Sequence, residues 1–479
     1  MSRSILVCKE TYGGSSRERL YVIPPAQKNI VSVVLVDNKR ATIINWFTKV
    51  FLPQGYPKSV SDDYLSYQIW DTAQAFCSTI TGTLATQEVL RGVGVGSTEA
   101  TPLAATITWV VKDSCGHLGK ILFAFSHGTH LDAYSKTWRL YADTLNDAAM
   151  CVEIALPLFK NMTTFLLCLS TVMKAIVGVA GGATRAALTQ HHAVRSNLGD
   201  VAAKDAAQET AVNLVASMAA LLVISVFGNS LVIFSLLTVL HIVFNYLAVR
   251  SVCLRSLNEP RLLQLTDLYL RHGALATPEQ VNRSEPLVFY QLGGSMLDLK
   301  LCGFQIKLGH SFNSVLKHYN ASELQSILDV YEKRQYMVVP AVGSRRMFVF
   351  VTSQAKATDV LCGYLHAVML AAVTCAINDV QLPILNMPST RPFAELCLSM
   401  QGSECSRSPV PEAALTAHGL VYNPSLELMR DMDQVVQREW LTVYRGMKQT
   451  GWDVSTHLLV LDEWRMHRQN ASEVKVATD

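Results

Sequence analysis

The pattern of apolar and polar positions divides the chain into three parts. In the first part, residues 1–50, the runs 19–23 and 30–36 are rich in β-branched side chains and predict a small β region. Residues 51–262 carry long apolar runs with helical spacing, which predict a helical core. From residue 300 to 479, shorter strand-like and helix-like runs alternate and predict a separate α+β domain.

The most apolar segment is 210–249, which contains no Asp, Glu, Lys or Arg. A membrane-spanning helix needs about 20 residues, so these 40 residues predict two helices rather than one. The turn residues 228–230 (Gly-Asn-Ser) mark the break, and the two arms are expected to form a tight hairpin in a membrane. Basic residues from Arg250 onward favour the cytoplasm or an organelle matrix for that end. The alternative is a helical pair buried in a soluble core, because the first arm is short for a span.

Two further apolar runs leave the number of membrane crossings open. Residues 162–183 are interrupted by Lys174, which is costly at mid-bilayer, so we expect an interfacial or bundle-buried helix there. Residues 361–377 lie between a predicted hairpin and the amphipathic helix 425–450. We therefore expect that helix to pack on a sheet.

The C-terminal domain is expected to follow the β-α-β-β-α-(α)-β order of a split βαβ, ferredoxin-like sandwich. Five prolines predict a mobile loop over residues 378–411. The expected elements are a strand at 308–316, a helix at 321–332, a hairpin at 336–342 and 347–352, a helix at 357–377 and a last strand at 452–461. The fold class is thus a mainly α, membrane-associated helical core with an apolar hairpin, followed by an α+β domain.

Composition narrows the class of protein. Half of the residues are hydrophobic and 16% are charged, against about 25% in an average globular domain. The net charge of +3 does not suggest a nucleic-acid surface. The 11 cysteines form no CxxC pair and are expected to be buried thiols in a reducing compartment. The first residues lack the pattern of a secretory signal, so we expect an intracellular membrane and no secretion.

One polar stripe could carry chemistry. On the helix predicted over 138–156, Arg139, Asp143, Asp147 and Glu153 share one face at 100° per residue. Three carboxylates on one face could hold a metal ion, bind a cationic group or relay protons. The alternative is a solvated face on which Arg139 and Asp143 form an i,i+4 pair worth a few tenths of a kcal/mol.

A glycine-rich segment offers four further candidate ligand-binding residues, Gly181, Gly182, Thr184 and Arg185. Their backbone amides and the guanidinium could cradle a phosphate or carboxylate. The alternative is close helix packing through the small residues of this segment, such as Gly178, Gly182 and Ala186. Because a buried guanidinium needs a partner, we expect Arg185 to pair with Asp143 or Asp147.

The histidines and the known catalytic motifs give no further site. The close pairs His127/His130 and His191-His192 lack the i,i+4 spacing that places two ligands on one helix face, so no metal site is expected. Neither GxSxG, nor a Walker loop, nor a kinase signature occurs, so no catalytic residue is assigned and no enzyme is expected.

Several long strings resemble the root UVB sensitive (RUS) family. They are LPQGYPKSV at 52–60, DYLSYQIWD at 63–71, WRLYADTLND at 138–147 and VAGGATRAALT at 179–189. The resemblance is dense over residues 50–261 and looser beyond. It implies a membrane protein tied to vitamin B6 homoeostasis that associates with relatives, and it supplies no catalytic residues.

Three functions follow from the pattern and the resemblance together. The first is a non-enzymatic intracellular membrane protein with an interaction or homoeostasis role, partnered by a related family member or by a second copy. The second is a small-solute transporter that uses an intramembrane carboxylate/Arg site. The third is a binder of vitamin B6 phosphate, with pyridoxal phosphate held at Arg185 and its neighbouring amides.

Overall fold

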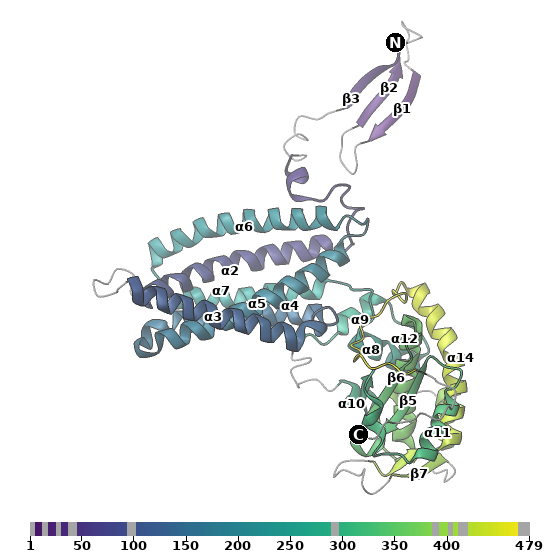
Figure 1. Cartoon of the computed structure of the whole chain (residues 1–479). Helices are drawn as coiled ribbons and strands as arrows, with labels where there is room; N and C mark the ends of the chain where they lie inside the picture. The colour runs from purple at the N-terminus through teal and green to yellow at the C-terminus, as the bar shows by residue number, and fades with distance from the viewer. Residues whose placement is uncertain are drawn as a thin grey trace. The chain divides into compact units, whose positions relative to one another are not determined.

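The chain is described by a computed structural model that covers residues 5–11, 18–24, 30–36, 46–92, 102–288, 297–385, 392–400, 406–410 and 420–467. It divides into two compact units, Met1–Val252 (unit 1) and Cys253–Asp479 (unit 2) (Figure 1). Both units are mainly helical, and unit 2 carries small mixed sheets.

Unit 1 begins with an antiparallel sheet in the order β1-β2-β3, formed by β1 (Ile5–Thr11), β2 (Glu18–Ile23) and β3 (Ser32–Val36). The strands expected from the β-branched runs are present as β2 and β3. Strand β1 was not predicted, because Lys9 and Glu10 interrupt its apolar pattern. In the sheet Glu10 lies opposite Arg19, so its charge has a cross-strand partner.

The rest of unit 1 is a bundle of long helices. The helices are α2 (Tyr64–Gly92), α3 (Pro102–His127), α4 (Ser135–Ile154), α5 (Thr163–His192), α6 (Leu198–Phe227) and α7 (Leu231–Ser251). Helix α2 packs against α4, α6 and α7, whereas α5 packs mainly against α3 and α4. The segment with Lys174 is thus part of one continuous helix.

The break predicted inside the charge-free segment is confirmed. Helix α6 ends at Phe227, Gly228 adopts a φ of 64° that favours glycine, and α7 begins at Leu231. The expected tight hairpin is wrong in one respect, because both arms pack along α2, which lies between them in Figure 1. Helix α6 also starts at Leu198, which gives it 30 residues and enough length to span a bilayer.

Glycine packing occurs at a different place from the one expected. A Cβ added at Gly116 or Gly119 of α3 would lie 2.9 Å from Thr171 Cγ2 or 3.0 Å from Val172 Cγ1 of α5. These two glycines therefore let α3 and α5 approach closely. An added Cβ at Gly178, Gly181 or Gly182 would meet no atom of the described chain within 4 Å. The close-packing interpretation of that segment is therefore wrong within this chain.

Unit 2 is an α+β fold. Its helices are α8 (Glu259–His272), α9 (Pro278–Ser284), α10 (Leu297–Cys302), α11 (Ala321–Val330), α12 (Ala357–Ile377), α13 (Pro392–Met400) and α14 (Leu426–Thr450). Its strands are β4 (Gln305–Leu308), β5 (Tyr336–Ala341), β6 (Arg346–Val351), β7 (Arg407–Pro409) and β8 (Tyr422–Pro424). The main sheet has the order β4-β6-β5, with β4 parallel and β5 antiparallel to β6, and β7 pairs with β8. The predicted 336–352 hairpin and the helices at 321, 357 and 425 are confirmed.

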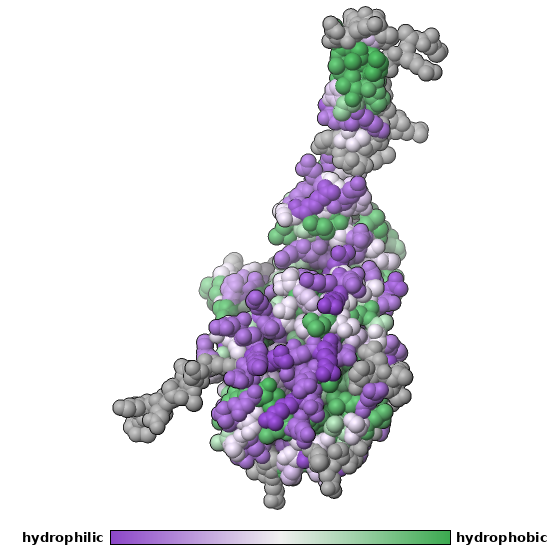
Figure 2. Space-filling model, turned by 90° about the vertical axis from the view of Figure 1, so that its right-hand side faces the viewer, coloured by the Kyte–Doolittle hydropathy of each residue, from purple (hydrophilic) through white to green (hydrophobic). Residues whose placement is uncertain are grey.

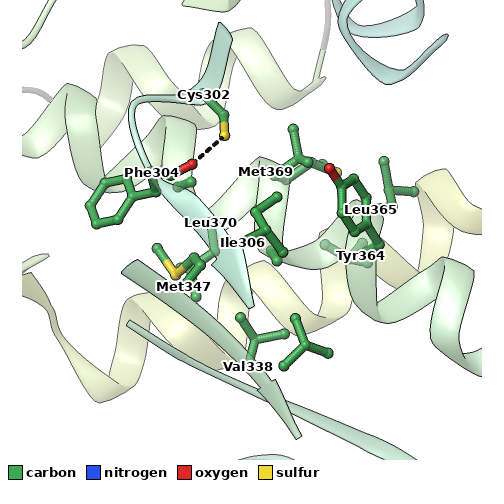
Figure 3. Close-up of a cluster of buried hydrophobic side chains, with 14 of the residues drawn as sticks. Cys302, Phe304, Ile306, Val338, Met347, Tyr364, Leu365, Met369 and Leu370 are labelled. Carbon is green, nitrogen blue, oxygen red and sulfur yellow. Dashed lines mark hydrogen bonds between the residues drawn. The ribbon is translucent and has the colours of Figure 1, made fainter. Parts of the chain in front are cut away.

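Helix α12 forms the centre of unit 2. It packs on β5, β6 and α14, and Figure 3 shows its Leu365, Met369 and Leu370 among the side chains of the sheet. Gly363 permits this approach, since an added Cβ there would lie 3.1 Å from both Tyr336 Cγ and Val349 Cγ1. The expectation that this apolar helix packs on a sheet is confirmed.

Three expectations for unit 2 are wrong. Strand β4 ends at Leu308, and a 3-10 helix, Phe312–Val315, follows the positive φ of Gly309. The last strand expected at 452–461 is irregular, and its amides at Asp453 and Leu458 donate to the carbonyls of Arg255 and Leu257 rather than to the main sheet. The ferredoxin-like order is therefore incomplete in the described residues. The loop expected over 378–411 contains α13 and β7, and Pro392 is the first residue of α13, a position that tolerates proline.

Within the described residues, four helices are long and apolar enough to cross a membrane, namely α5, α6, α7 and α12. Their burial separates them into two groups. Only 22%, 11% and 28% of the apolar windows of α5, α6 and α7 are buried, whereas that of α12 is 100% buried. Helix α12 therefore serves as a core helix of unit 2, and the other three present apolar surface outward.

Candidate functional site

The helical bundle of unit 1 places apolar side chains outside and charged side chains inside. Phe125 of α3, Val226 of α6 and Val232 of α7 are 91%, 71% and 77% exposed. In contrast, Asp147 of α4 and His241 of α7 are 3% and 0% exposed. This arrangement is the reverse of that of a water-soluble domain, in which charged side chains are almost never fully buried unless they are paired.

Helix α2 carries the interior polar groups. Gln68, Asp71 and Gln74 follow one another at i,i+3 spacing, and Glu88 continues the buried polar face near the end of the helix. Each of the four contacts a polar side chain of α4, α6, α7 or the α6–α7 turn. We call the buried polar network that these four residues start the polar axis. Its other members are Arg139, Asp143, Asp147, Arg185, Asp205, Glu209, Asn229 and His241.

The first part of the polar axis joins α2, α5 and α6. Gln68 Nε2 donates to Asp205 Oδ1 at 3.0 Å, and Arg185 Nε donates to Asp205 Oδ2 at 2.8 Å. Arg185 also forms an ion pair with Glu209. One guanidinium thus faces two carboxylates.

The second part joins α2 and α4 around Arg139. This guanidinium lies 3.0 Å from Asp71 Oδ1 and 3.4 Å from Asp143 Oδ2. The three side chains are 14–20% exposed, so the charges are largely shielded from solvent. Here too one cation faces two carboxylates.

The third part is the most deeply buried. His241 Nδ1 lies 2.7 Å from Asp147 Oδ2, and the other ring nitrogen lies 2.7 Å from Gln74 Nε2. A single imidazole thus links α2, α4 and α7. Because Gln74 can donate through its amide group, the ring can accept a hydrogen bond at one nitrogen and donate to Asp147 at the other.

The acidic stripe predicted on 138–156 exists, and it faces inward. Asp143, Asp147 and Glu153 each meet a different cation or histidine, with Glu153 Oε2 lying 2.6 Å from Lys174 Nζ of α5. Ala148, on the other side of this helix, is exposed. The face is therefore not solvated, although the i,i+4 pair of Arg139 and Asp143 expected in that alternative is present. The three carboxylates do not converge on one point.

The glycine-rich candidates lie within α5. Gly181 and Gly182 stand in the middle of this helix, so their amides lie in the helical ladder rather than in a phosphate-binding loop. Thr184 Oγ1 donates to the carbonyl of Ala180 at 2.8 Å. Arg185 pairs with the carboxylates of α6 and not with Asp143 or Asp147, so its expected pairing is wrong.

Several residues of the polar axis were missed from sequence. Gln68, Asp71 and Gln74 could have been found by their i,i+3 spacing within a long apolar helix. His241 had a signal as well, since it is the one imidazole inside the 40 residues without Asp, Glu, Lys or Arg. An ionisable side chain in such a segment marks a functional site by default.

Comparison with known proteins identifies the family. Residues 37–273 match the family described as "Vitamin B6 photo-protection and homoeostasis domain", and residues 274–468 match "Root UVB sensitive protein, C-terminal". The chain is 34% identical over 369 residues to protein root UVB sensitive 3 of Arabidopsis thaliana, covering 76% of this chain and 83% of that protein. The chain belongs to the RUS family.

Other members of the RUS family are also similar. RUS family member 1 of Dictyostelium discoideum is 44% identical over 259 residues, which are 52% of this chain and 49% of that protein, so the chain matches about half the length of this relative. Protein root UVB sensitive 2, chloroplastic, of Arabidopsis thaliana is 28% identical over 73% of this chain and 79% of its own length. No solved structure matches the chain.

Proposed function

We propose that this RUS-family chain acts in vitamin B6 homoeostasis as an intracellular membrane protein that catalyses no reaction itself. The supporting observation is the reversed arrangement of unit 1, with apolar side chains outside and the polar axis inside. In a bilayer the outward side chains of α5, α6 and α7 contact lipid, whereas the pairs Arg139–Asp71 and His241–Asp147 are shielded from it. The family match supports the vitamin B6 role.

Unit 2 suits the aqueous phase. Helix α14 has a polar outer face, and Figure 2 shows hydrophilic residues across the face of unit 2 that this helix covers. Burial raises the pKa of Cys362, Cys375 and Cys397 to about 12, so these thiols stay protonated and are poor nucleophiles. This is consistent with a role that involves no covalent chemistry.

Membrane insertion is tested by two matched substitutions of exposed leucines. Leu221 on α6 is 63% exposed and Leu441 on α14 is 57% exposed. The wild-type chain should stay in membranes washed with alkaline carbonate, and Leu221→Lys should lower the amount of inserted chain in that fraction, because a lysine in the lipid-facing part of a spanning helix costs about 3 kcal/mol. Leu441→Lys should leave the chain in the membrane fraction.

The cellular role needs its own measurement. In cells that lack the chain, pyridoxal phosphate measured by liquid chromatography should differ from wild type. Leu441→Lys should restore its level, whereas Leu221→Lys should not. Wild-type chain that is washed off by carbonate, or equal restoration by both variants, contradicts the proposal.

A second candidate function is transport of protons or a small cationic solute along the polar axis. The observation that favours it is that Arg139 and Arg185 each face two carboxylates, which leaves negative charge for a mobile cation. Binding of a vitamin B6 phosphate is favoured less, because the charge of Arg185 is already neutralised by two carboxylates.

Transport is tested with the full-length chain in liposomes. The chain should carry protons, which trapped pyranine reports, or it should carry pyridoxamine. Asp71→Asn should slow the flux at least tenfold, whereas the control Asp431→Asn on α14 should leave it unchanged. A flux equal to that of empty liposomes would contradict transport.

We also expect a partner chain in the membrane, either a second copy or a related family member, and no nucleic acid. Gly178, Gly182 and Ala186 lie at i,i+4 spacing on α5 and all three are exposed. Small residues with this spacing let transmembrane helices associate closely. This face supports association between helices of different chains.

A further inference from the structure

A cluster of ligand-type side chains lies at the ends of two helices of unit 1, outside the polar axis. Asp63 directly precedes α2, and His191 and His192 are the last two residues of α5. The backbone holds these ends together, because Ser61 N donates to His192 O at 3.2 Å and Val60 forms a bridge with Ala193. The side chains therefore converge on a fixed frame.

Both carboxylate oxygens of Asp63 lie near His191, and one of them also lies near His192. Oδ2 and Oδ1 lie 2.9 Å and 3.2 Å from His191 Nε2, and Oδ1 lies 3.5 Å from His192 Nδ1. The donor atoms of the three residues all lie within 4.8 Å of one another. Two ligands of a tetrahedral ion with bonds near 2.1 Å are roughly 3.4 Å apart, so this set can close around an ion with small side-chain shifts.

We propose that Asp63, His191 and His192 bind a divalent first-row transition-metal ion, for which Zn²⁺ is the test ion. Two imidazole nitrogens and one carboxylate oxygen suit this class of ion, whereas Ca²⁺ and Mg²⁺ take oxygen ligands. The Ser61 hydroxyl lies 2.7 Å from His192 Nδ1 and 2.5 Å from Asp63 Oδ1, so it bridges two of the ligand atoms and would shift when an ion binds. This hydroxyl or a water molecule would then be the fourth ligand.

Two surrounding features favour a cation at this place. The histidines stand at the C-terminal end of the 30-residue α5, where the helix dipole favours positive charge. His192 is 2% exposed, and its Nε2 has no hydrogen-bond partner among the described residues. A metal-bound histidine normally donates its second N–H to an acceptor. His192 also lines a cavity of about 10 Å³ beside Gln68 and Asp205, which is room for one water that can accept this bond.

This site was not predictable from the sequence. His191 and His192 are neighbours rather than four residues apart, and the third ligand, Asp63, lies 128 residues before His191. The ion would fasten the start of α2 to the end of α5. It would thus hold the end of the bundle at which the polar axis begins.

Binding is tested with full-length chain purified in detergent, stripped with EDTA and titrated with Zn²⁺ by calorimetry. Wild-type chain should bind about one equivalent at this site. Asp63→Asn and His191→Ala should each weaken binding more than tenfold. The control is the double variant His127→Ala/His130→Ala, which removes another close histidine pair and should bind like wild type.

Thermal unfolding keeps the test decisive if a variant is unstable. EDTA should lower the Tm of the wild-type chain, and added Zn²⁺ should restore it. The Tm of Asp63→Asn, whose side chain keeps nearly the same size, should respond to neither. Equal Zn²⁺ binding by wild type and Asp63→Asn, or a wild-type Tm that ignores both EDTA and Zn²⁺, overturns the proposal and leaves a hydrogen-bonded His–Asp cluster.

Discussion

His241 Nδ1 lies 2.7 Å from Asp147 Oδ2, and both side chains are buried between helices α4 and α7. His241→Ala removes the partner of a buried carboxylate, and breaking a buried pair costs about 3–5 kcal/mol. We expect the largest fall in thermal stability in detergent among single substitutions in the polar axis.

A double-mutant cycle separates this pair from general packing. His241→Ala/Asp147→Ala should be less destabilised than the sum of the two single variants, because neither partner is then left unpaired. Additive losses would show that the two side chains do not interact.

The glycines of α3 and α5 should respond oppositely to the same substitution. Gly119→Val places new atoms against Val172 and should cost about 1–3 kcal/mol of stability. A Cβ at Gly178 would meet no atom within 4 Å, so Gly178→Val should leave the Tm within a few degrees of wild type. Thermal unfolding of the two purified variants checks this, and equal losses would contradict the geometry.

The exposed small residues of α5 should control association instead. Gly182→Val, alone and with Gly178→Val, should weaken chain–chain crosslinking in membranes while the fold stays intact. Leu441→Val on α14 is the control and should crosslink like wild type. Unchanged crosslinking in the glycine variants would exclude this face as the contact.

A fall in pH should lower the free energy of unfolding of unit 2, because His366 is buried there. Burial lowers its pKa from 6.5 to about 4. The unfolded chain therefore binds a proton between these pH values while the folded chain does not, so stability is complete above about pH 6.5 and falls as the pH drops towards 4. The loss between pH 7 and 5 is about 2 kcal/mol.

Hydrogen exchange of peptides from β5 and α12, corrected for the intrinsic rate, measures this loss. His366→Gln should have a flatter pH profile, because it keeps polar atoms near Tyr331 and Tyr336 without the titrating ring. The same slope in both proteins would assign the acid sensitivity to another group.

The sequence predicted the helices and strands better than it predicted the contacts between them. The charge-free run and the turn residues at 228–230 located the α6–α7 break, because both signals are local. The 336–352 hairpin was predictable for the same reason. The position of α2 between α6 and α7 could not be predicted, since those helices are more than 100 residues apart from it in sequence.

Arg185 shows that the partner of a single side chain is also hard to predict from the sequence. Its need for a carboxylate was predictable from the cost of a buried charge, but Asp143, Asp147 and Asp205 were all chemically suitable. Only the packing of α5 against α6 selects Asp205. Likewise, the irregular segment 452–461 has a strand-like pattern, but its Asp453 and Leu458 amides donate to carbonyls at residues 255 and 257, far away in sequence.

The central place of α2 sets an order for biosynthesis. Its last residue, Gly92, is made well before Leu198, where α6 begins. At 5–20 residues per second, this interval lasts roughly 5–20 s. During that time α4 supplies Arg139 to Asp71, but Gln68 and Gln74 still lack the partners on α6 and α7 that they have in the finished bundle. We therefore expect α2 to remain bound to the insertion machinery or to a chaperone until α6 and α7 have been synthesised and pack on it.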